Sequence, residues 1–449
     1  MIKVLILAYD FPPYVSVGGQ RPYSWYKYFK NFGVEPIVIT RQWSNAYGNA
    51  LDFVAPSESL MLEVEQNEWG TLLRTPYRPT WSHRLLLKYG PKRFRRVRSV
   101  FTGALAFLQF YLPVGSQREM YRAGYAFLKN NAVDFIIATG EPFVLFHYAR
   151  KLSKKFDIPW LADYRDPWSN QFERNSLILL YAWQKRVERR IVSHACHAIT
   201  VSAFTKEKIK VTVPKLSLTV IPNGFDEAVL QKVTVPKQRT DCLSIAYVGT
   251  LYDWHPLDYF LSLLNQYVVE NKATISMNFY GVNQEDWILR HVNEVYPALT
   301  SMVLVHKKIP YEQLLPALAE NHVMLLFNYY SFMGTKVFDY LAIKRKILLC
   351  FLDDPIAEAL KRTAFPTHES ENTDVSLQAT LLEKTKGGIG VKDGLHLLEV
   401  LNQLQREFNQ NGFVNADPIG LEAYTRKANV SQFAQVLKML LADKKQLED

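Results

Sequence analysis

Cysteine is scarce in this sequence, and no apolar run is long. The three cysteines, Cys196, Cys242 and Cys350, are far apart and lack the spacing of a metal site or a disulfide framework. Each lies in or beside an apolar run, so we expect three small core residues in a protein of a reducing compartment. The stretch nearest in length to a membrane-spanning helix, Val100–Val114, is still too short and contains Gln109.

Two common signatures are also missing. The strand-like IKVLILAY follows Met1 directly, without the basic and apolar layout of a secretory signal, so we expect a cytoplasmic protein. Neither G-x-G-x-x-G nor a P-loop follows the first predicted strand of either half of the chain, which argues against a dehydrogenase.

Positive charge is in excess. The sequence has 53 Lys and Arg against 43 Asp and Glu, a formal net charge of +10 at pH 7. This balance favours anionic partners, which include nucleotides, nucleic acid and anionic membrane surfaces, and does not choose among them. Positive charge is concentrated in the segment KYGPKRFRRVRSVFTGALAFL, whose cations include Lys92, Arg93, Arg95, Arg96 and Arg98.

This segment predicts a basic amphipathic helix over residues 92–108. Its apolar residues at helical spacing are Phe94, Val97, Phe101, Leu105 and Leu108. Two interpretations stay open: the helix lies on an anionic bilayer, or it faces the protein core and leaves its basic end in solvent. Nucleic acid is a poorer interpretation, because no recognised binding module accompanies the patch.

Buried strands alternate with helices through both halves of the chain. This pattern predicts two Rossmann-like doubly wound α/β domains that face each other across a cleft. We place the domains at residues 1–226 and 241–420, joined by a linker at 227–240. A closing segment, residues 421–449, contains an amphipathic helix that begins at 421. After Leu352 the pattern predicts only helices and loops before that last helix.

In the first half, the candidate site residues follow predicted strands or lie just beyond them. They are Gly18, Gly19, Gln20, Arg21, His147, Asp163, Arg165 and Asp166. The adjacent glycines let backbone amides approach a ligand, although they also fit an ordinary flexible loop. The acid–Arg–acid cluster at a strand end fits a ligand site and fits a buried ion network equally well. The histidine is in a helix, where a lone histidine is more often structural.

In the second half, the candidate residues centre on Val323–Leu352, which reads as strand, glycine loop, helix and strand. The residues are Gly249, Thr250, Gly281, Gly334, Thr335, Lys336 and Asp339. We expect Thr335 to cap a helix over residues 336–344, with Lys336 and Asp339 sharing one face. Such a helix start is where α/β proteins bind phosphorylated ligands, although one more crossover with surface charges fits equally well.

An ordered set of segments resembles a known family. It comprises ILAYDFPPYVSVGGQRPY, VDFIIATGEP, IPWLADYRDPW, AITVS, VIPNGFD, AYVGTLY, FYGV, KIPYEQLLPAL and GTKVFDYLAIKRKIL. In this order, from residue 1 to about residue 350, the sequence resembles retaining glycosyltransferases of GT-B architecture and is similar to glycosyltransferase family 4.

The resemblance implies a nucleotide diphosphate sugar donor held by the C-terminal domain and a glycan or lipid-linked acceptor held mainly by the N-terminal domain. It also implies that the closing helix packs back on the N-terminal domain. On this basis the donor-binding residues are Gly18, Gly19, Gly249, Thr250, Gly281, Ile309, Gly334, Thr335, Lys336 and Asp339. The acceptor-side residues are Gln20, Arg21, His147, Asp163 and Asp166. The catalytic residues are Asp163, Arg165 and Lys336. No metal and no cofactor are expected.

The sequence departs from the family pattern in two motifs, the paired acids and the loop after Leu243–Val248. Ser331 stands where the first of two motif acids is expected, and Asp339, a methylene shorter than Glu, stands at the second. The Arg and Lys expected after the strand Leu243–Val248 have no clear match. The leading hypothesis is retaining, metal-independent sugar transfer in cell-surface polysaccharide or glycoconjugate synthesis, at the inner face of the plasma membrane through the basic helix. The alternatives are a nucleotide-sugar epimerase and a catalytically degenerate nucleotide-sugar-binding or scaffold protein.

Overall fold

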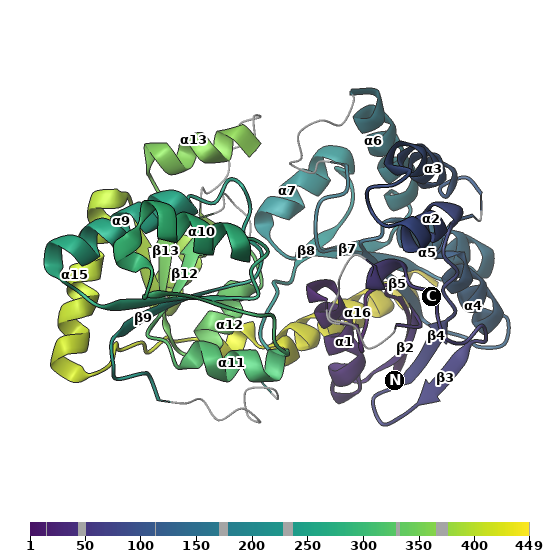
Figure 1. Ribbon diagram of the computed structural model, residues 1–449. Coiled ribbons are helices and arrows are strands. Elements are labelled where there is room, and N and C mark those ends of the chain that lie inside the picture. The colour runs from purple at the N-terminus through teal and green to yellow at the C-terminus, as the bar shows by residue number, and fades with distance from the viewer. Residues whose placement is uncertain are drawn as a thin grey trace. The chain divides into compact units, whose positions relative to one another are not determined.

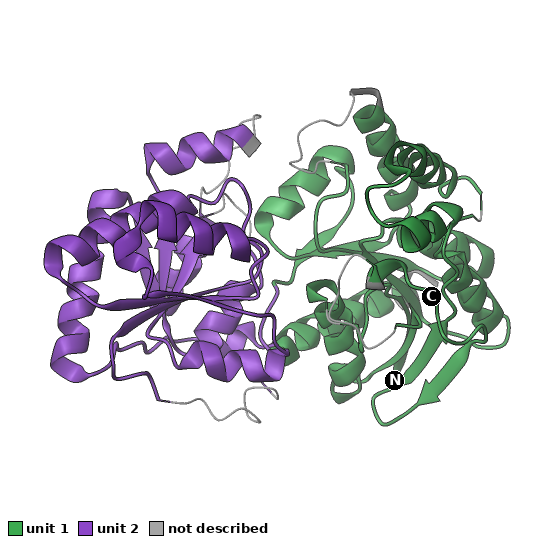
Figure 2. Ribbon diagram, viewed as in Figure 1, with its two compact units in different colours: residues 1–171, 176–222, 426–449 green, residues 172–175, 223–425 purple. Residues whose placement is uncertain are grey.

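The chain divides into two compact units. The computed structural model describes residues 1–14, 16–43, 51–112, 114–169, 178–227, 237–328, 333–364 and 376–448. Unit 1 contains the described residues up to 222 and those from 426 onward, and unit 2 contains those from 223 to 425 (Figure 2). The N-terminal part of unit 1 thus ends at residue 222. Ser331 and most of the predicted linker lie outside the described residues.

Unit 1 is built on an eight-stranded sheet in the order β3-β4-β2-β1-β5-β6-β7-β8 (Figure 1). Its strands are β1 (Ile2–Leu7), β2 (Val34–Arg41), β3 (Glu63–Gln66), β4 (Thr71–Thr75), β5 (Phe135–Gly140), β6 (Trp160–Tyr164), β7 (His197–Thr200) and β8 (Leu218–Val220). All neighbours are parallel except the edge pair β3 and β4, which is antiparallel.

The helices of unit 1 cover both faces of this sheet. They are α1 (Val17–Tyr28), α2 (Trp81–Tyr89), α3 (Arg95–Leu108), α4 (Arg118–Leu128), α5 (Val144–Phe156), α6 (Ile178–Val192), α7 (Ala203–Thr212) and α16 (Arg426–Glu448), with short 3-10 turns at Phe29–Phe32 and Asp52–Val54. Alternate side chains of β1 point to opposite faces. Leu5 and Leu7 pack in one core with α4 and α5, whereas Val4 and Ile6 pack in the other with α1 and α16.

Unit 2 is built on a six-stranded, fully parallel sheet in the order β11-β10-β9-β12-β13-β14. Its strands are β9 (Leu243–Val248), β10 (Ile275–Tyr280), β11 (Val303–His306), β12 (Val323–Phe327), β13 (Lys346–Cys350) and β14 (Gly388–Val391). Its helices are α9 (Leu257–Asn271), α10 (Glu285–Val295), α11 (Tyr311–Ala319), α12 (Lys336–Ala342), α13 (Pro355–Ala364), α14 (Leu377–Thr385) and α15 (Gly394–Asn411), with 3-10 turns at Pro297–Leu299 and Leu421–Tyr424. The prediction of two doubly wound α/β domains is confirmed.

The prediction missed strand β14, which the sequence places among helices and loops. Its sequence, GIGV, has few of the residues that favour strands. The strand forms because glycine permits close approach to β13. A Cβ at Gly388 would overlap the carbonyl oxygen of Ile347. Glycine is therefore required here by packing, which a local pattern does not reveal.

Two further expectations need correction. The closing helix begins at Arg426 rather than at Leu421, because Leu421–Tyr424 form a 3-10 turn after Gly420, whose φ is +68°. Of the three cysteines, Cys350 is buried but Cys196 is exposed, so Cys196 is not a core residue. In the part of the chain that the structure describes, no helix has both the length and the apolarity to cross a membrane.

Helix α16 packs against α1 through a buried aromatic contact. Phe433 is fully buried, and its ring lies 5.2 Å from that of Trp25 and 5.5 Å from that of Phe29, centroid to centroid. The C-terminal segment therefore contributes to the core of unit 1, although more than two hundred residues separate it in sequence from β8.

We expect Phe433→Ala to lower the free energy of unfolding of unit 1 by about 3–5 kcal/mol, because it leaves a cavity between α1 and α16. Met439→Ala in the same helix is the control, since Met439 is 52% exposed. Urea unfolding followed by circular dichroism measures both. Equal effects of the two substitutions would contradict the packing described.

Candidate functional site

The candidate residues lie where the strand order reverses. In unit 2 the chain runs outward from β9 to β10 and β11, then returns to the other side of β9 with β12. In unit 1 the same reversal lies between β1 and β5. The carboxyl ends of strands at such a reversal form the usual ligand crevice of doubly wound sheets. Each unit therefore has its own candidate site.

In unit 2, the loop after β9 meets the first residue of α12. The Lys336 amine donates to the Tyr247 hydroxyl over 3.0 Å and contacts the Thr250 carbonyl oxygen at 3.4 Å. The Tyr247 hydroxyl in turn donates to the same carbonyl over 2.7 Å. Gly249 has φ +84°, and a Cβ there would lie 3.2 Å from Cε of Lys336. Glycine thus allows both the turn and the close approach of the lysine.

Lys336 carries a charge in a poorly solvated position. Burial lowers the pKa of its amine from 10.5 to about 8. Among the described residues it forms no ion pair with a carboxylate, and its amine lies 4.5 Å from the centre of the Tyr247 ring. A cation that is buried without a counter-ion gains most from an anionic ligand.

His255 adjoins this lysine, and the sequence interpretation missed it. Its Nδ1 accepts a hydrogen bond from the Tyr252 amide over 3.2 Å. Burial, followed by the charges of Lys336 and of Lys361 on α13, lowers the pKa of His255 to about 3. The histidine is therefore neutral at physiological pH, and the two lysines are both close enough to act on it. The sequence alone gave no sign of Lys361, because it is remote in the chain.

The other predicted donor residues are spread along the same sheet edge. Gly281, with φ +58° after β10, lies against Lys308, next to Ile309 in the loop after β11. Gly334 and Thr335 are half-buried before α12. Thr335 makes no side-chain cap, so that prediction is wrong: its backbone is already helical, whereas a capping residue is extended.

Asp339 lies one turn along α12 from Lys336. Its carboxylate accepts a hydrogen bond from the hydroxyl of Tyr311, the first residue of α11. The contacts of the described residues do not join Asp339 to Lys336. A ligand that reaches Asp339 would share that carboxylate with Tyr311.

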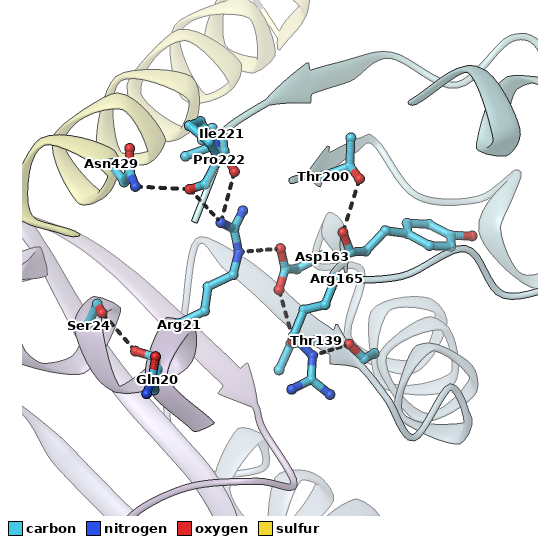
Figure 3. Close-up of polar contacts among 12 residues, drawn as sticks. Gln20, Arg21, Ser24, Thr139, Asp163, Arg165, Thr200, Ile221, Pro222 and Asn429 are labelled. Atoms are coloured by element: carbon cyan, nitrogen blue, oxygen red, sulfur yellow. Dashed lines mark hydrogen bonds and ion pairs between the residues drawn. The ribbon is translucent and has the colours of Figure 1, made fainter. Parts of the chain in front are cut away.

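In unit 1, a buried ion pair joins α1 to β6 (Figure 3). Arg21 Nε lies 2.9 Å from Asp163 Oδ1, and Thr139 donates to Asp163 Oδ2 over 2.7 Å. Arg21 Nη1 also donates to the carbonyl oxygen of Ile221 over 2.9 Å. Asp163 is 0% exposed and both of its oxygens are bonded. It therefore holds other groups in place rather than contacting a substrate, which favours the ion-network interpretation.

Arg165 extends from the end of β6 towards the start of α1. It donates to the carbonyl oxygens of Gly140 and Glu141, the latter over 2.8 Å, and its Nη1 lies 3.8 Å from the carboxylate of Asp10. A Cβ at Gly18 would overlap the Arg165 guanidinium. Burial raises the pKa of Asp10. The sequence interpretation missed Asp10, although its position just after β1 could have indicated it.

The backbone amides of Gly18 and Gly19 donate hydrogen bonds within their own loop. The Gly18 amide donates to the Ser16 side chain over 3.1 Å, and the Gly19 amide donates to the Ser16 carbonyl over 3.2 Å. Ser16 thus caps α1, and its hydroxyl also donates to Asp10 over 3.0 Å. A diphosphate would have to displace these bonds to reach the two amides.

The remaining acceptor-side residues lie at different positions in unit 1. The Gln20 side chain accepts a hydrogen bond from Arg426 of α16 over 2.6 Å. Asp166 is half-buried beside Arg165, and burial raises the pKa of its carboxyl. His147 is 4% exposed in α5, where burial lowers its pKa to about 3, and neither ring nitrogen has a partner among the described residues. This position favours a structural role for His147.

The chain is similar to known proteins in part of its sequence and in its fold. Residues 23–229 match the model of the family described as Glycosyltransferase Family 4. This segment is therefore similar to glycosyltransferase family 4. No curated protein sequence matches the chain.

Solved structures similar to the whole chain include three enzymes. Sucrose-phosphate synthase from Thermosynechococcus elongatus is 14% identical, with 100% of this chain and 98% of that chain covered and a TM-score of 0.58. A UDP-forming α,α-trehalose-phosphate synthase from Burkholderia xenovorans, in complex with glucose-6-phosphate, is 12% identical, with 98% and 100% covered and a TM-score of 0.58. A lipopolysaccharide outer core galactosyltransferase is 12% identical, with 97% and 100% covered and a TM-score of 0.53. The chain therefore has the GT-B fold.

Asp163→Asn tests the buried ion pair of unit 1. We expect it to lower the free energy of unfolding of unit 1 by about 3 kcal/mol, because Arg21 keeps its charge and loses its counter-ion. Replacing both partners, as in Arg21→Met with Asp163→Leu, should recover part of this loss. Chemical unfolding of the three variants measures the effect, and a double variant less stable than Asp163→Asn would contradict it.

Lys336→Met tests the cost of burying the amine. A lysine pKa lowered on folding means that the unfolded chain binds the proton more tightly, so the charge destabilises the fold below about pH 8 and the penalty disappears as pH rises to 10.5. We expect the substitution to raise the unfolding free energy of unit 2 at pH 7 by on the order of 2 kcal/mol, and to have little effect at pH 10.5. A pH-independent effect in urea unfolding would show that the amine is well solvated.

Proposed function

We propose that the protein is a glycosyltransferase that moves a sugar from a nucleotide diphosphate sugar to a glycan or lipid-linked acceptor. Transfer would retain the anomeric configuration and would need neither a metal nor a cofactor. The donor would bind unit 2 and the acceptor unit 1. The half-buried Lys336 at the strand-order reversal carries this proposal, together with the family 4 match.

The chemistry follows from charge. When the sugar leaves, the nucleotide diphosphate carries away negative charge, and stabilising that charge is the main electrostatic task of the protein. Lys336 would meet a diphosphate in a poorly solvated position, where an ionic contact is stronger than in water. Lys361, close enough to lower the pKa of His255, would add a second positive charge in place of those missing after β9.

In unit 1, we propose that Arg165 and Asp10 contact the acceptor, while Asp163 positions Arg21. Arg165 is held by two backbone carbonyls, and its Nη1 lies 3.8 Å from the carboxylate of Asp10, whose pKa burial raises. Among the similar solved structures, the galactosyltransferase is described as an enzyme of the lipopolysaccharide outer core, and the trehalose-phosphate synthase is described as UDP-forming. We therefore propose UDP-sugar as the first donor to test and a cell-surface glycan or glycolipid as the acceptor class.

Nucleotide binding is the first test. We expect UDP, GDP or ADP, at about a hundred times its dissociation constant, to stabilise the wild type by roughly 2.7 kcal/mol in thermal unfolding. The stabilisation should be lost in Lys336→Met and kept in Lys384→Met, because Lys384 is exposed on α14. Stabilisation that survives in Lys336→Met would place the nucleotide elsewhere.

Affinity for that nucleotide should also fall above about pH 8 in the wild type, because the free amine loses its charge there. The same fall should occur in Lys384→Met, which keeps Lys336. Calorimetric titration from pH 6.5 to 9.5 checks this. Product analysis then separates the alternatives. Sugar transfer to acceptor supports the proposal, conversion of the donor without acceptor indicates an epimerase, and binding without either indicates a degenerate protein.

A further inference from the structure

Helices α2 and α3 form a pair that exposes much apolar surface. None of the side chains of α3 is buried. Val97 is 42% exposed, Val100 71% and Phe101 48%, and Trp81 of α2 is 50% exposed with its ring 4.6 Å from that of Phe101. The interpretation in which this amphipathic helix faces the core is therefore wrong. Figure 1 shows the two helices beside each other, outside the strands of unit 1.

The pair has polar contacts inside and apolar side chains outside. The Ser82 hydroxyl lies 2.9 Å from that of Thr102 and 3.2 Å from the carbonyl oxygen of Arg98, which joins α2 to α3. At the end of α3, Phe107 stacks on Trp183 of α6 with ring centroids 5.0 Å apart. This anchor fixes the pair on unit 1 and leaves Val97 and Val100 directed away from its interior. Such an arrangement suits an apolar environment better than water.

The charge of this region has one sign. Between residues 69 and 118 the sequence contains no Asp or Glu. The cations there are Arg74, Arg78, Arg84, Lys88, Lys92, Arg93, Arg95, Arg96, Arg98 and Arg118. Arg93, Arg95 and Arg96 are exposed where α3 begins, beside the exposed ring of Phe94. Arg74 and Arg118 pair with Glu65 and Glu119. The cations beside the exposed apolar side chains, Arg93, Arg95 and Arg96, have no acid in this segment of the sequence to offset them.

We propose that the α2–α3 pair docks on an anionic lipid bilayer, with Val97, Val100 and Phe101 among the acyl chains and the arginines at lipid phosphates. Lipid satisfies both parts of the surface. A second copy of this chain would bring the same positive charge and be repelled, and nucleic acid would leave the apolar side chains uncovered. The inference rests on the proposed function in one respect, because it identifies where a lipid-linked acceptor would be met.

Vesicle flotation of the full chain tests this. We expect binding to equal mixtures of phosphatidylcholine and phosphatidylglycerol, little binding to phosphatidylcholine alone, and loss of binding as salt rises, because salt screens exposed charges. The triple variant R93E, R95E, R96E should bind at least tenfold more weakly. The variant V97S, V100S should also bind more weakly, without a change in charge.

The matched control is K129E, K154E, K155E, which makes the same change of charge at exposed lysines just after α4 and in the last turn of α5. We expect it to bind as the wild type does, and circular dichroism confirms that each variant folds. Equal losses in the control and in the arginine variant would reduce the effect to net charge and overturn the proposal. So would dimerisation that V97S, V100S abolishes, or displacement from vesicles by duplex DNA. The arginine variant should keep the nucleotide-induced thermal shift, so failure of either proposal is seen separately.

Discussion

The parallel pairing of β9 with β12 is the constraint on which the candidate donor site depends. Val323 pairs with Ile245 and Met324 with Ala246, which places the ends of two strands, distant in sequence, at one edge of the sheet. The loop after β9 and the start of α12 then meet, and Lys336 reaches Tyr247 and Thr250 across 89 and 86 residues of sequence. No local interaction would hold them together, so the site exists only while the strands pair.

The candidate cations of the two units differ in their partners. In unit 1, Arg21 has a carboxylate and backbone carbonyls as partners, so its charge is compensated within the fold. In unit 2, the partners of Lys336 among the described residues are a hydroxyl, a carbonyl and an aromatic ring, and its pKa falls to about 8. A compensated charge stabilises a scaffold, whereas an uncompensated one is costly until an anion arrives. This difference separates a residue that maintains the structure from one that is suited to ligand binding.

The α2–α3 pair exposes apolar side chains of a kind that is usually buried. The positive charge around them indicates which environment suits this surface. Its apolar residues remain exposed after folding, and the nearest acids in sequence, Glu68 and Glu119, lie outside the segment. Exposed apolar area is unfavourable in water, and the clustered positive charges repel one another until an anionic surface offsets them. Anchoring through Phe107 and Trp183 keeps this surface in a fixed position on unit 1.

The sequence by itself determined the two doubly wound domains, because uninterrupted apolar strands such as Val323–Phe327 can only be buried on both faces. It also located Lys336, since a cation after a strand and a glycine loop is a local pattern. Only the tertiary structure decided that Asp163 is a buried counter-ion, that His147 lies in the core, and that Asp10, His255 and Lys361 adjoin the candidate sites. These outcomes depend on contacts between distant segments, and β14 shows the same limit: Gly388 is explained by the backbone of β13, not by its own neighbours in sequence.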